Sequence, residues 1–237
     1  KTKIICTIGP ASQNEETLTQ MCLAGMNVAR LNFSHGDHAE QQNKVDLIKK
    51  VREKLNLPIA MMLDTKGPEY RIKTFENGKI FLNDGDTFTF TVDDVVGNQE
   101  RVSVTFPDLI KNLKVGDTIM VSNGLIIFEV VKLKGNDAIC KVISGGEVSD
   151  KKSMNFPNKV MSGEYLSEKD KEDLLFGIRN EVDFVAASFV STKQNVVDLR
   201  TFLDENGGSE IDIIAKIENR AGVDNIEEIC EIADGIM

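Results

Sequence analysis

Short apolar runs alternate with amphipathic stretches in the first third of the chain. The apolar runs fit buried strands, and polar residues that can cap helices stand after them. The predicted strands span residues 3–8, 27–33 and 59–63, and the predicted helices run from a Ser12/Glu15 cap to about Gly25 and from an Asp37/Glu40 cap to about Leu55. Two consecutive strand–helix–strand units imply parallel pairing with right-handed crossovers.

The pattern changes from about Tyr70, where short β-rich runs are separated by turn signals and no helical periodicity intervenes. These runs cover residues 87–92, 101–105, 117–121, 126–133 and 138–142. Gly145-Gly146 is interpreted as a plain turn, because no helix follows it. The segment is therefore predicted to form a small all-β domain.

Strand–helix alternation resumes at Ser167, which can cap a helix together with Asp170. The predicted elements that follow are a strand over residues 183–189, a helix from Thr192 to about Asn206, a strand over residues 211–217, a short helix and the opening of a sixth strand at residues 235–237. The predicted fold class is α/β: a partial (β/α)8 barrel of the TIM type, interrupted after its third strand by the all-β domain.

The expected domains are residues 1–67 as the first part of the barrel, residues 68–162 as an inserted lid, and residues 163–237 as the continuation of the barrel. A closed barrel needs eight units and about 250 residues. An unfinished apolar strand would also leave an unpaired sheet edge. We therefore expect the chain to be the front part of a larger protein.

Composition and charge narrow the classes of function. The chain has 28 Lys and Arg against 38 Asp and Glu, and this acidic balance argues against a general nucleic-acid surface. The sequence has no signal-peptide pattern and no apolar run long enough to span a bilayer, so we expect a soluble cytoplasmic protein without membrane partners.

The cysteines and histidines do not suggest a disulfide framework or a zinc site. The four cysteines form no C-x-x-C pair and are expected to be buried reduced thiols: Cys6, Cys22, Cys140 and Cys230. The only two histidines, His35 and His38, are too few for a zinc site and are interpreted as polar residues beside a helix cap.

The candidate chemistry lies where the predicted parallel strands end, because functional groups in β/α domains gather at the carboxyl ends of strands. The run Ile211–Asn219 places Lys216 and Glu218 on one face at the end of a buried strand. A buried ion pair explains this pattern about as well as a catalytic role does. Similar groups at two other strand ends favour the catalytic role.

The second predicted strand ends with Arg30, Asn32 and Ser34 on one face, which gives a cation and two neutral oxygen groups. Helix capping is the alternative role, and it is compatible with phosphate binding at a helix N-terminus. The third strand ends with Asp64 and Thr65, which could offer oxygens to a metal or could form an ordinary polar loop. Together these groups suit a phosphorylated substrate and hard metal ions.

Five strings along the chain closely resemble the pyruvate kinase family, in the form found in bacteria. They are CTIGPAS (6–12), NVARLNFSHG (27–36), LDTKGPE (63–69), AKIEN (215–219) and DGIM (234–237). The resemblance implies phosphoryl transfer from phosphoenolpyruvate to ADP, giving pyruvate and ATP in glycolysis. It also implies Mg²⁺ (or Mn²⁺) and K⁺ as cofactors and a full-length protein that is a homotetramer.

The resemblance also implies roles for single residues. Arg30 and Lys216 would be catalytic and would bind phosphoenolpyruvate, Arg30 at the phosphoryl group and Lys216 at the charge that moves in the reaction. Glu218 would bind Mg²⁺. The potassium site would be formed by Asn32, Ser34, Asp64 and Thr65. The nucleotide contacts would come from Asn32, Ser34, His35, Arg71 and Lys152, the last of these acting from the lid.

The chain departs from the family pattern in several places. The family's second magnesium carboxylate and its glycine-rich substrate turn belong to the segment after DGIM, so the chain alone is expected to be inactive. Residues 122–125 lack a usual acidic pair, Val190-Ser191 stands where an arginine is common, and residues 162–165 replace a hinge motif. Two alternatives stay open: a non-catalytic nucleotide- or metabolite-binding fragment, and a carbon–carbon lyase, against which the insert and LDTKGPE argue.

Overall fold

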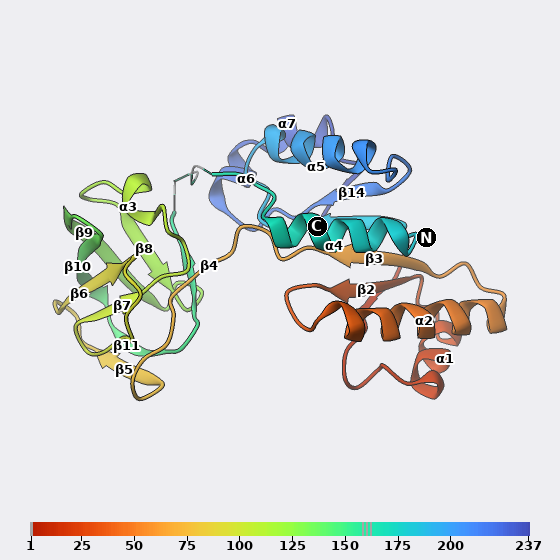
Figure 1. The fold of residues 1–237 in the computed structure, drawn as a ribbon, viewed down its shortest axis with the longest axis horizontal. Helices are drawn as coiled ribbons and strands as arrows, with labels where there is room; N and C mark the ends of the chain where they lie inside the picture. Colours follow the sequence, from red (N-terminus) through yellow and green to blue (C-terminus); the bar gives the residue numbers. More distant parts are fainter. Residues whose placement is uncertain (1, 158, 160, 162) are drawn as a thin grey trace. The chain divides into compact units, whose positions relative to one another are not determined.

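The computed structural model describes residues 2–157, 159, 161 and 163–237. The chain folds into two compact units, drawn in Figure 1. One unit takes in the chain up to Pro68 together with Glu164–Glu218 and Gly222–Met237, and the other takes in Glu69–Gly163 with Asn219–Ala221. The expected end of the insert, residue 162, lies outside the described residues.

The first unit is built on a six-stranded parallel sheet whose spatial order is β1-β2-β3-β13-β14-β15. The bounds are β1 (Ile5–Thr7), β2 (Val28–Asn32), β3 (Ala60–Asp64), β13 (Phe184–Ala187), β14 (Asp212–Ala215) and β15 (Gly235–Ile236). Each new strand is added at the same edge of the sheet, which is how a (β/α) barrel is built. The predicted sixth strand is thus confirmed.

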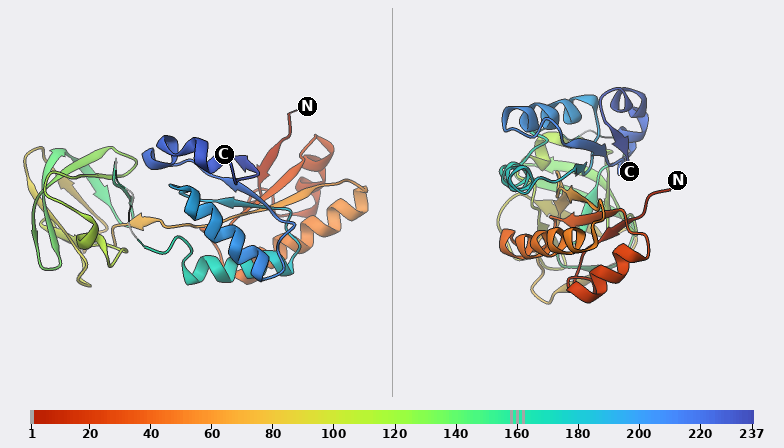
Figure 2. Two further views of the ribbon diagram at one scale, coloured as in Figure 1. Left: turned by 90° about the horizontal axis from the view of Figure 1, so that it is seen from above. Right: turned by 90° about the vertical axis from the view of Figure 1, so that its right-hand side faces the viewer.

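Helices cover the outer face of this sheet. They are α1 (Glu15–Leu23), α2 (His38–Leu55), α4 (Glu168–Arg179), α5 (Lys193–Glu205), α6 (Arg220–Asp224) and α7 (Ile226–Cys230). In the right-hand view of Figure 2 they form an arc around the curved strands. Strand residues such as Leu31, Leu63 and Ile213 are fully buried, in the same core cluster as Val45 of α2 and Leu199 of α5.

The opposite face of the sheet carries a smaller apolar cluster of Val28, Met62 and Ala186, all buried. Because side chains alternate across a strand, the residues of this cluster alternate with those that face the helices. Burial on both faces explains why these strands are nearly continuous apolar runs in the sequence.

Three of the predicted helix starts are confirmed, and one of them is Thr192, the N-cap of α5. The Asp37 side chain accepts a hydrogen bond from the Glu40 backbone N–H at 2.9 Å, and α2 ends at Leu55 as expected. Ser167 and Asp170 form a reciprocal capping box at the start of α4.

The predicted start of α1 is wrong. Its N-cap is Asn14, whose side-chain oxygen accepts from the Thr17 N–H at 2.9 Å. Ser12 instead closes a turn with Gly9, because its hydroxyl accepts from the Gly9 N–H at 3.0 Å. The N-cap therefore lies two residues after the turn that the Ser12 side chain completes.

The second unit consists mainly of strands. A seven-stranded sheet has the order β4-β12-β8-β9-β10-β6-β7, and β11 pairs with β5 in a separate ribbon. The bounds are β4 (Tyr70–Arg71), β5 (Lys79–Leu82), β6 (Thr87–Thr91), β7 (Arg101–Ser103), β8 (Thr118–Val121), β9 (Ile126–Lys134), β10 (Asp137–Ser144), β11 (Gly146–Ser149) and β12 (Ser153–Asn155), with one short helix, α3 (Leu109–Asn112). Phe88, Phe90 and Phe128 pack against one another in its core.

The interpretation of Gly145-Gly146 as a plain turn is wrong. Gly146 opens β11 and is paired with Leu82 of β5. A side chain at Gly145 would stand 2.3 Å from the Leu82 carbonyl oxygen, so the two backbones approach closely there. The glycines thus permit a strand pairing that their sequence pattern did not reveal.

All four cysteines are free. Cys22 and Cys140 are buried as expected, and burial raises the pKa of both thiols, that of Cys140 to about 12. The prediction of burial is wrong for Cys230, which is exposed at the end of the short helix α7, and Cys6 is only half-buried. In the part of the chain that the structure describes, no helix is long and apolar enough to cross a membrane.

Candidate functional site

Strand register brings several polar side chains to the same end of the parallel sheet. Asp64, the last residue of β3, is paired with Asn32 on one side and with Ala186 on the other. Ala187 is paired with Ala215, so the residues that follow them, Ser188 and Lys216, leave the sheet side by side.

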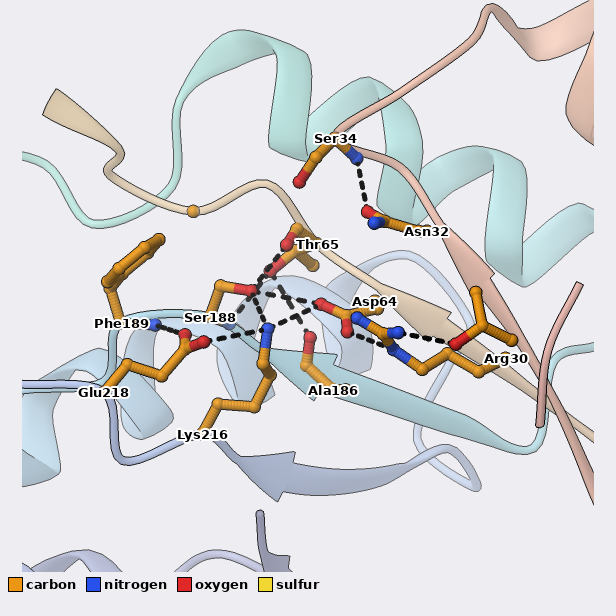
Figure 3. Close-up of polar contacts among 12 residues, drawn as sticks. Arg30, Asn32, Ser34, Asp64, Thr65, Ala186, Ser188, Phe189, Lys216 and Glu218 are labelled. Carbon is orange, nitrogen blue, oxygen red and sulfur yellow. Dashed lines mark hydrogen bonds and ion pairs between the residues drawn. The ribbon is translucent and has the colours of Figure 1, made fainter. Parts of the chain in front are cut away.

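Five residues at this end of the sheet form one contact network, which is shown in Figure 3 and is called the strand-end cluster below. Its members are Arg30, Asp64, Ser188, Lys216 and Glu218. All five belong to the first unit, although they come from four separate stretches of the sequence.

Asp64 is the centre of this network. It is 1% exposed, and its two carboxylate oxygens receive different cations. Oδ2 accepts from Arg30 Nε at 2.6 Å, and Oδ1 accepts from Lys216 Nζ at 3.0 Å. Burying an isolated charge at such a position would cost several kcal/mol, and the contacts with the two cations offset that cost.

Lys216 extends its ammonium group among three oxygens. They are Asp64 Oδ1 at 3.0 Å, Ser188 Oγ at 2.8 Å and Glu218 Oε1 at 3.3 Å. The expectation that Lys216 belongs to the strand itself is wrong, because β14 ends at Ala215. The Lys216 N–H still donates to the Ala187 carbonyl at 2.9 Å, and the Lys216 and Glu218 side chains come into contact.

Glu218 lies at the more open side of the strand-end cluster, with its side chain about one third exposed (34%). Its Oε2 accepts a hydrogen bond from the Phe189 backbone N–H at 3.0 Å. Phe189 has a φ of 56°, a left-handed conformation that is uncommon for an aromatic residue. Strained backbone of this kind tends to persist at functional sites.

Ser188 is the member that sequence reasoning missed. Its hydroxyl lies 2.6 Å from the Thr65 carbonyl oxygen and 3.1 Å from Asp64 Oδ1, and it also contacts Lys216. The rule used for the other members could have found it, because Ser188 directly follows β13. A serine that follows two alanines carries no charge, so the sequence pattern alone does not indicate a functional role for it.

Thr65 is buried behind the strand-end cluster, at 3% exposure. Its hydroxyl accepts from the Ser188 N–H at 3.1 Å and lies 3.4 Å from the Ala186 carbonyl oxygen. Gly67 passes close by, since a side chain there would stand 2.8 Å from the Ser188 carbonyl oxygen. Its φ of 66° is a second reason for glycine at this position.

The end of β2 and the loop after it carry three further predicted site residues. Asn32 Oδ1 accepts from the Ser34 N–H at 2.9 Å, as Figure 3 shows. Gln41 of α2 donates its amide N–H groups to the carbonyls of Asn32 and His35, at 3.0 and 2.9 Å. Ser34 and His35 are exposed in this turn, and Asn32 stands next to Asp64 in the sheet.

Arg71 and Lys152 belong to the second unit. Arg71 forms an ion pair with Glu69 and donates to the Lys151 carbonyl at 2.6 Å. Lys152 is exposed, and its carbonyl accepts from the Ile72 N–H at 3.0 Å. The Arg71 guanidinium group is therefore held by contacts within that unit, whereas the contact given for Lys152 is made by its backbone.

The oxygen groups of the first unit fit hard cations in chemical kind. Glu218 offers an exposed carboxylate, whereas no set of three or more His, Cys, Asp or Glu side chains gathers as a metal site among the described residues. A Mg²⁺ ion here would therefore need oxygens from a substrate as well. Asn32, Ser34, Asp64 and Thr65 each carry an oxygen that could serve as a ligand, which suits a monovalent cation.

Comparison with known proteins adds three findings. A sequence profile described as "Pyruvate kinase, barrel domain" matches residues 1–237. The chain is 46% identical to the pyruvate kinase of Clostridium perfringens and 45% identical to that of Geobacillus stearothermophilus, in each case over its whole length. A crystal structure of a pyruvate kinase from Cryptosporidium parvum superposes with a TM-score of 0.93 at 37% identity, again over the whole chain.

These similarities confirm the predicted fold class, which is an α/β fold with a partial (β/α)8 barrel. The chain spans about half the length of the relatives it matches: 50% of the Clostridium protein, 41% of the Geobacillus protein and 50% of the Cryptosporidium chain.

Proposed function

This chain belongs to the pyruvate kinase family, and we propose that the protein carrying it transfers the phosphoryl group of phosphoenolpyruvate to ADP, giving pyruvate and ATP. Because the chain spans about half of its relatives, the activity is proposed for the whole protein. The observation that carries the proposal is the Lys216 ammonium group, which stands between the buried Asp64 carboxylate and the more exposed Glu218.

Phosphoryl transfer requires positioning and neutralisation of charge more than covalent chemistry by the protein. Arg30 suits the first task. Asp64 and the Thr7 hydroxyl, each at 2.6 Å, hold its guanidinium group in place. A quarter of its side chain (26%) is still exposed to solvent. In our proposal Arg30 binds the phosphoryl group of phosphoenolpyruvate.

Lys216 suits the second task, because its charge stands in a largely buried place where electrostatic interactions are strong. We propose that Lys216 stabilises the negative charge that develops on the moving phosphoryl group and on the enolate. Glu218 would hold Mg²⁺ (or Mn²⁺), which when bound supplies further charge neutralisation. Potassium would be held by Asn32, Ser34, Asp64 and Thr65.

The nucleotide contacts are assigned to the turn after β2 and to the second unit. The residues are Asn32, Ser34, His35, Arg71 and Lys152. The second unit, Glu69–Gly163, would act as a lid that excludes water during transfer. As a member of a glycolytic family, the protein is proposed to act in the cytoplasm, as a homotetramer.

The proposal is tested by supplying phosphoenolpyruvate and ADP with Mg²⁺ and K⁺ to the protein that carries this sequence. We expect pyruvate and ATP in equal amounts, and no pyruvate when ADP is left out. Binding of both ligands without any product would contradict the proposal and favour a binding role. A polypeptide limited to residues 1–237 is expected to give no product, because Glu218 is the only exposed carboxylate that the described residues bring to the Lys216 ammonium group.

A further inference from the structure

The Lys216 ammonium group donates hydrogen bonds to Asp64 and Ser188 and forms an ion pair with Glu218. A lysine carries three N–H groups, and three oxygens surround this one, at 2.8, 3.0 and 3.3 Å. An anion that replaces Glu218 at the ammonium group would leave both of these hydrogen bonds in place. The three acceptors differ in how easily they can be released.

Glu218 is the acceptor that can leave. Its contact with Lys216 is the longest of the three, and its side chain is about one third exposed. Asp64 and Ser188 are 1% and 2% exposed, and both have further partners that hold them in place. When Glu218 turns to another cation, Asp64 and Ser188 still hold the ammonium group.

Hydrogen bonds hold both backbone polar groups of Ser188, its carbonyl and its N–H. The Tyr165 hydroxyl donates to the Ser188 carbonyl at 2.7 Å, and the Ser188 N–H donates to the Thr65 hydroxyl at 3.1 Å. Burial, followed by the charges of Asp170, Glu218 and Asp64, raises the pKa of Tyr165, so this phenol stays a donor.

The polarity of the Ser188 hydroxyl is also set by its surroundings. A hydroxyl has one hydrogen and two lone pairs. Its shortest acceptor contact is the Thr65 carbonyl oxygen at 2.6 Å, which takes the hydrogen, and the lone pairs can then accept from Lys216 at 2.8 Å. Ser188 therefore acts on Lys216 as a neutral hydrogen-bond acceptor.

Because the Ser188 hydroxyl is neutral, it does not reduce the positive charge that is available to a substrate. Arg30 and Lys216 share one buried carboxylate, Asp64, so one positive charge remains once Glu218 is withdrawn. A second carboxylate in place of Ser188 would cancel that charge. A hydroxyl directs the ammonium group and leaves its charge for the phosphoryl group.

We propose that Ser188 is a positioning residue for phosphoryl transfer: its hydroxyl holds the Lys216 ammonium group in place when Glu218 releases it. This inference rests on the proposed function, because it assigns Lys216 to the phosphoryl group. Ser188 itself does not touch the substrate in this arrangement and acts through Lys216.

The test uses the protein that carries this sequence and compares three variants with the wild type. We expect Ser188→Ala to lower kcat by about 10- to 100-fold, the range typical of partners that orient a functional group. KM for phosphoenolpyruvate should change by less than about threefold, because Arg30 is untouched. Ser188→Cys, similar in shape but a weak acceptor, should resemble Ser188→Ala.

Ser191→Ala is the matched control. Ser191 lies in the same segment, and its hydroxyl donates to the Phe189 carbonyl at 3.2 Å. We expect this variant to keep the wild-type kcat within about threefold, as for a substitution outside the site. Full activity of Ser188→Cys or Ser188→Ala, or an equal loss in Ser191→Ala, would overturn the proposal.

A second measurement does not depend on turnover. The side-chain ammonium signal of Lys216, followed by nitrogen NMR, should be ordered in the wild type and mobile in both Ser188 variants. Absence of turnover in the wild type would contradict the proposed function, and the NMR comparison would still show whether Ser188 holds Lys216. An equally ordered Lys216 in Ser188→Ala would overturn the positioning role.

Discussion

Replacing Lys216 by methionine is expected to lower kcat by about 10²- to 10³-fold, the effect of removing a preorganised charge-stabilising group. The ammonium group acts on charge that develops during transfer, and Arg30 keeps its own contacts with Asp64 and Thr7. KM for phosphoenolpyruvate should therefore change far less than kcat. Steady-state kinetics of the protein that carries this sequence measure both.

Lys169→Met is the matched control for this substitution. Lys169 also pairs with a buried carboxylate, Asp173, at 3.1 Å, but it lies on α4 outside the strand-end cluster. Its loss should leave kcat within a few-fold of the wild type. If Lys216→Met keeps its kcat and only KM rises, Lys216 serves ground-state binding instead of the transition state.

Asp64→Asn is expected to destabilise the protein by about 3–5 kcal/mol, the cost of breaking a buried ion pair by removing one partner. Asparagine keeps the shape but leaves Arg30 and Lys216 without the anion they share. The two cations would then repel each other in a largely buried place. Urea unfolding of the variant and the wild type measures the difference.

The comparison for this variant is Asp46→Asn on the exposed side of α2. Asp46 accepts a hydrogen bond from Gln42 at 2.8 Å and is exposed, so its change should stay within about 0.5 kcal/mol. Equal stability of the two variants would mean that Asp64 does not neutralise the pair of cations.

Functional groups in β/α domains gather at the carboxyl ends of parallel strands. This expectation predicted much of the site, because it depends only on the parallel register of the strands. Arg30, Asp64, Lys216 and Glu218 are far apart in sequence, yet the aligned ends of β2, β3 and β14 bring them together. Charged residues at the ends of apolar runs are visible in a sequence without any structure.

Other features of the site could not be predicted from the sequence. Ser188 is uncharged and follows two alanines, so its contact with Lys216 depends on how β13 ends beside β14. Asp64 was expected to serve as a metal ligand, and the sequence did not reveal that both of its oxygens receive cationic side chains.

The same limit holds for short elements. Which polar residue caps α1 was decided by the turn that Ser12 closes with Gly9, a competition between two local hydrogen-bond patterns. The strands β5 and β11 are four residues each and pair through a close backbone approach at Gly145. Neither feature produces a clear periodicity over a sequence window.

The most direct test of the claim that phosphoryl transfer takes place at the strand-end cluster is the Mg²⁺ dependence of pyruvate formation in Glu218→Gln. Glutamine keeps a neutral oxygen but loses the carboxylate charge that would hold the ion. Glu231→Gln is the control, since Glu231 is exposed and paired with Lys193 at 2.7 Å. We expect Glu218→Gln to need at least about tenfold more Mg²⁺ for its half-maximal rate, in the range for lost metal-site partners, and Glu231→Gln to match the wild type. Identical Mg²⁺ curves for Glu218→Gln and the wild type would contradict the assignment of the reaction to this site.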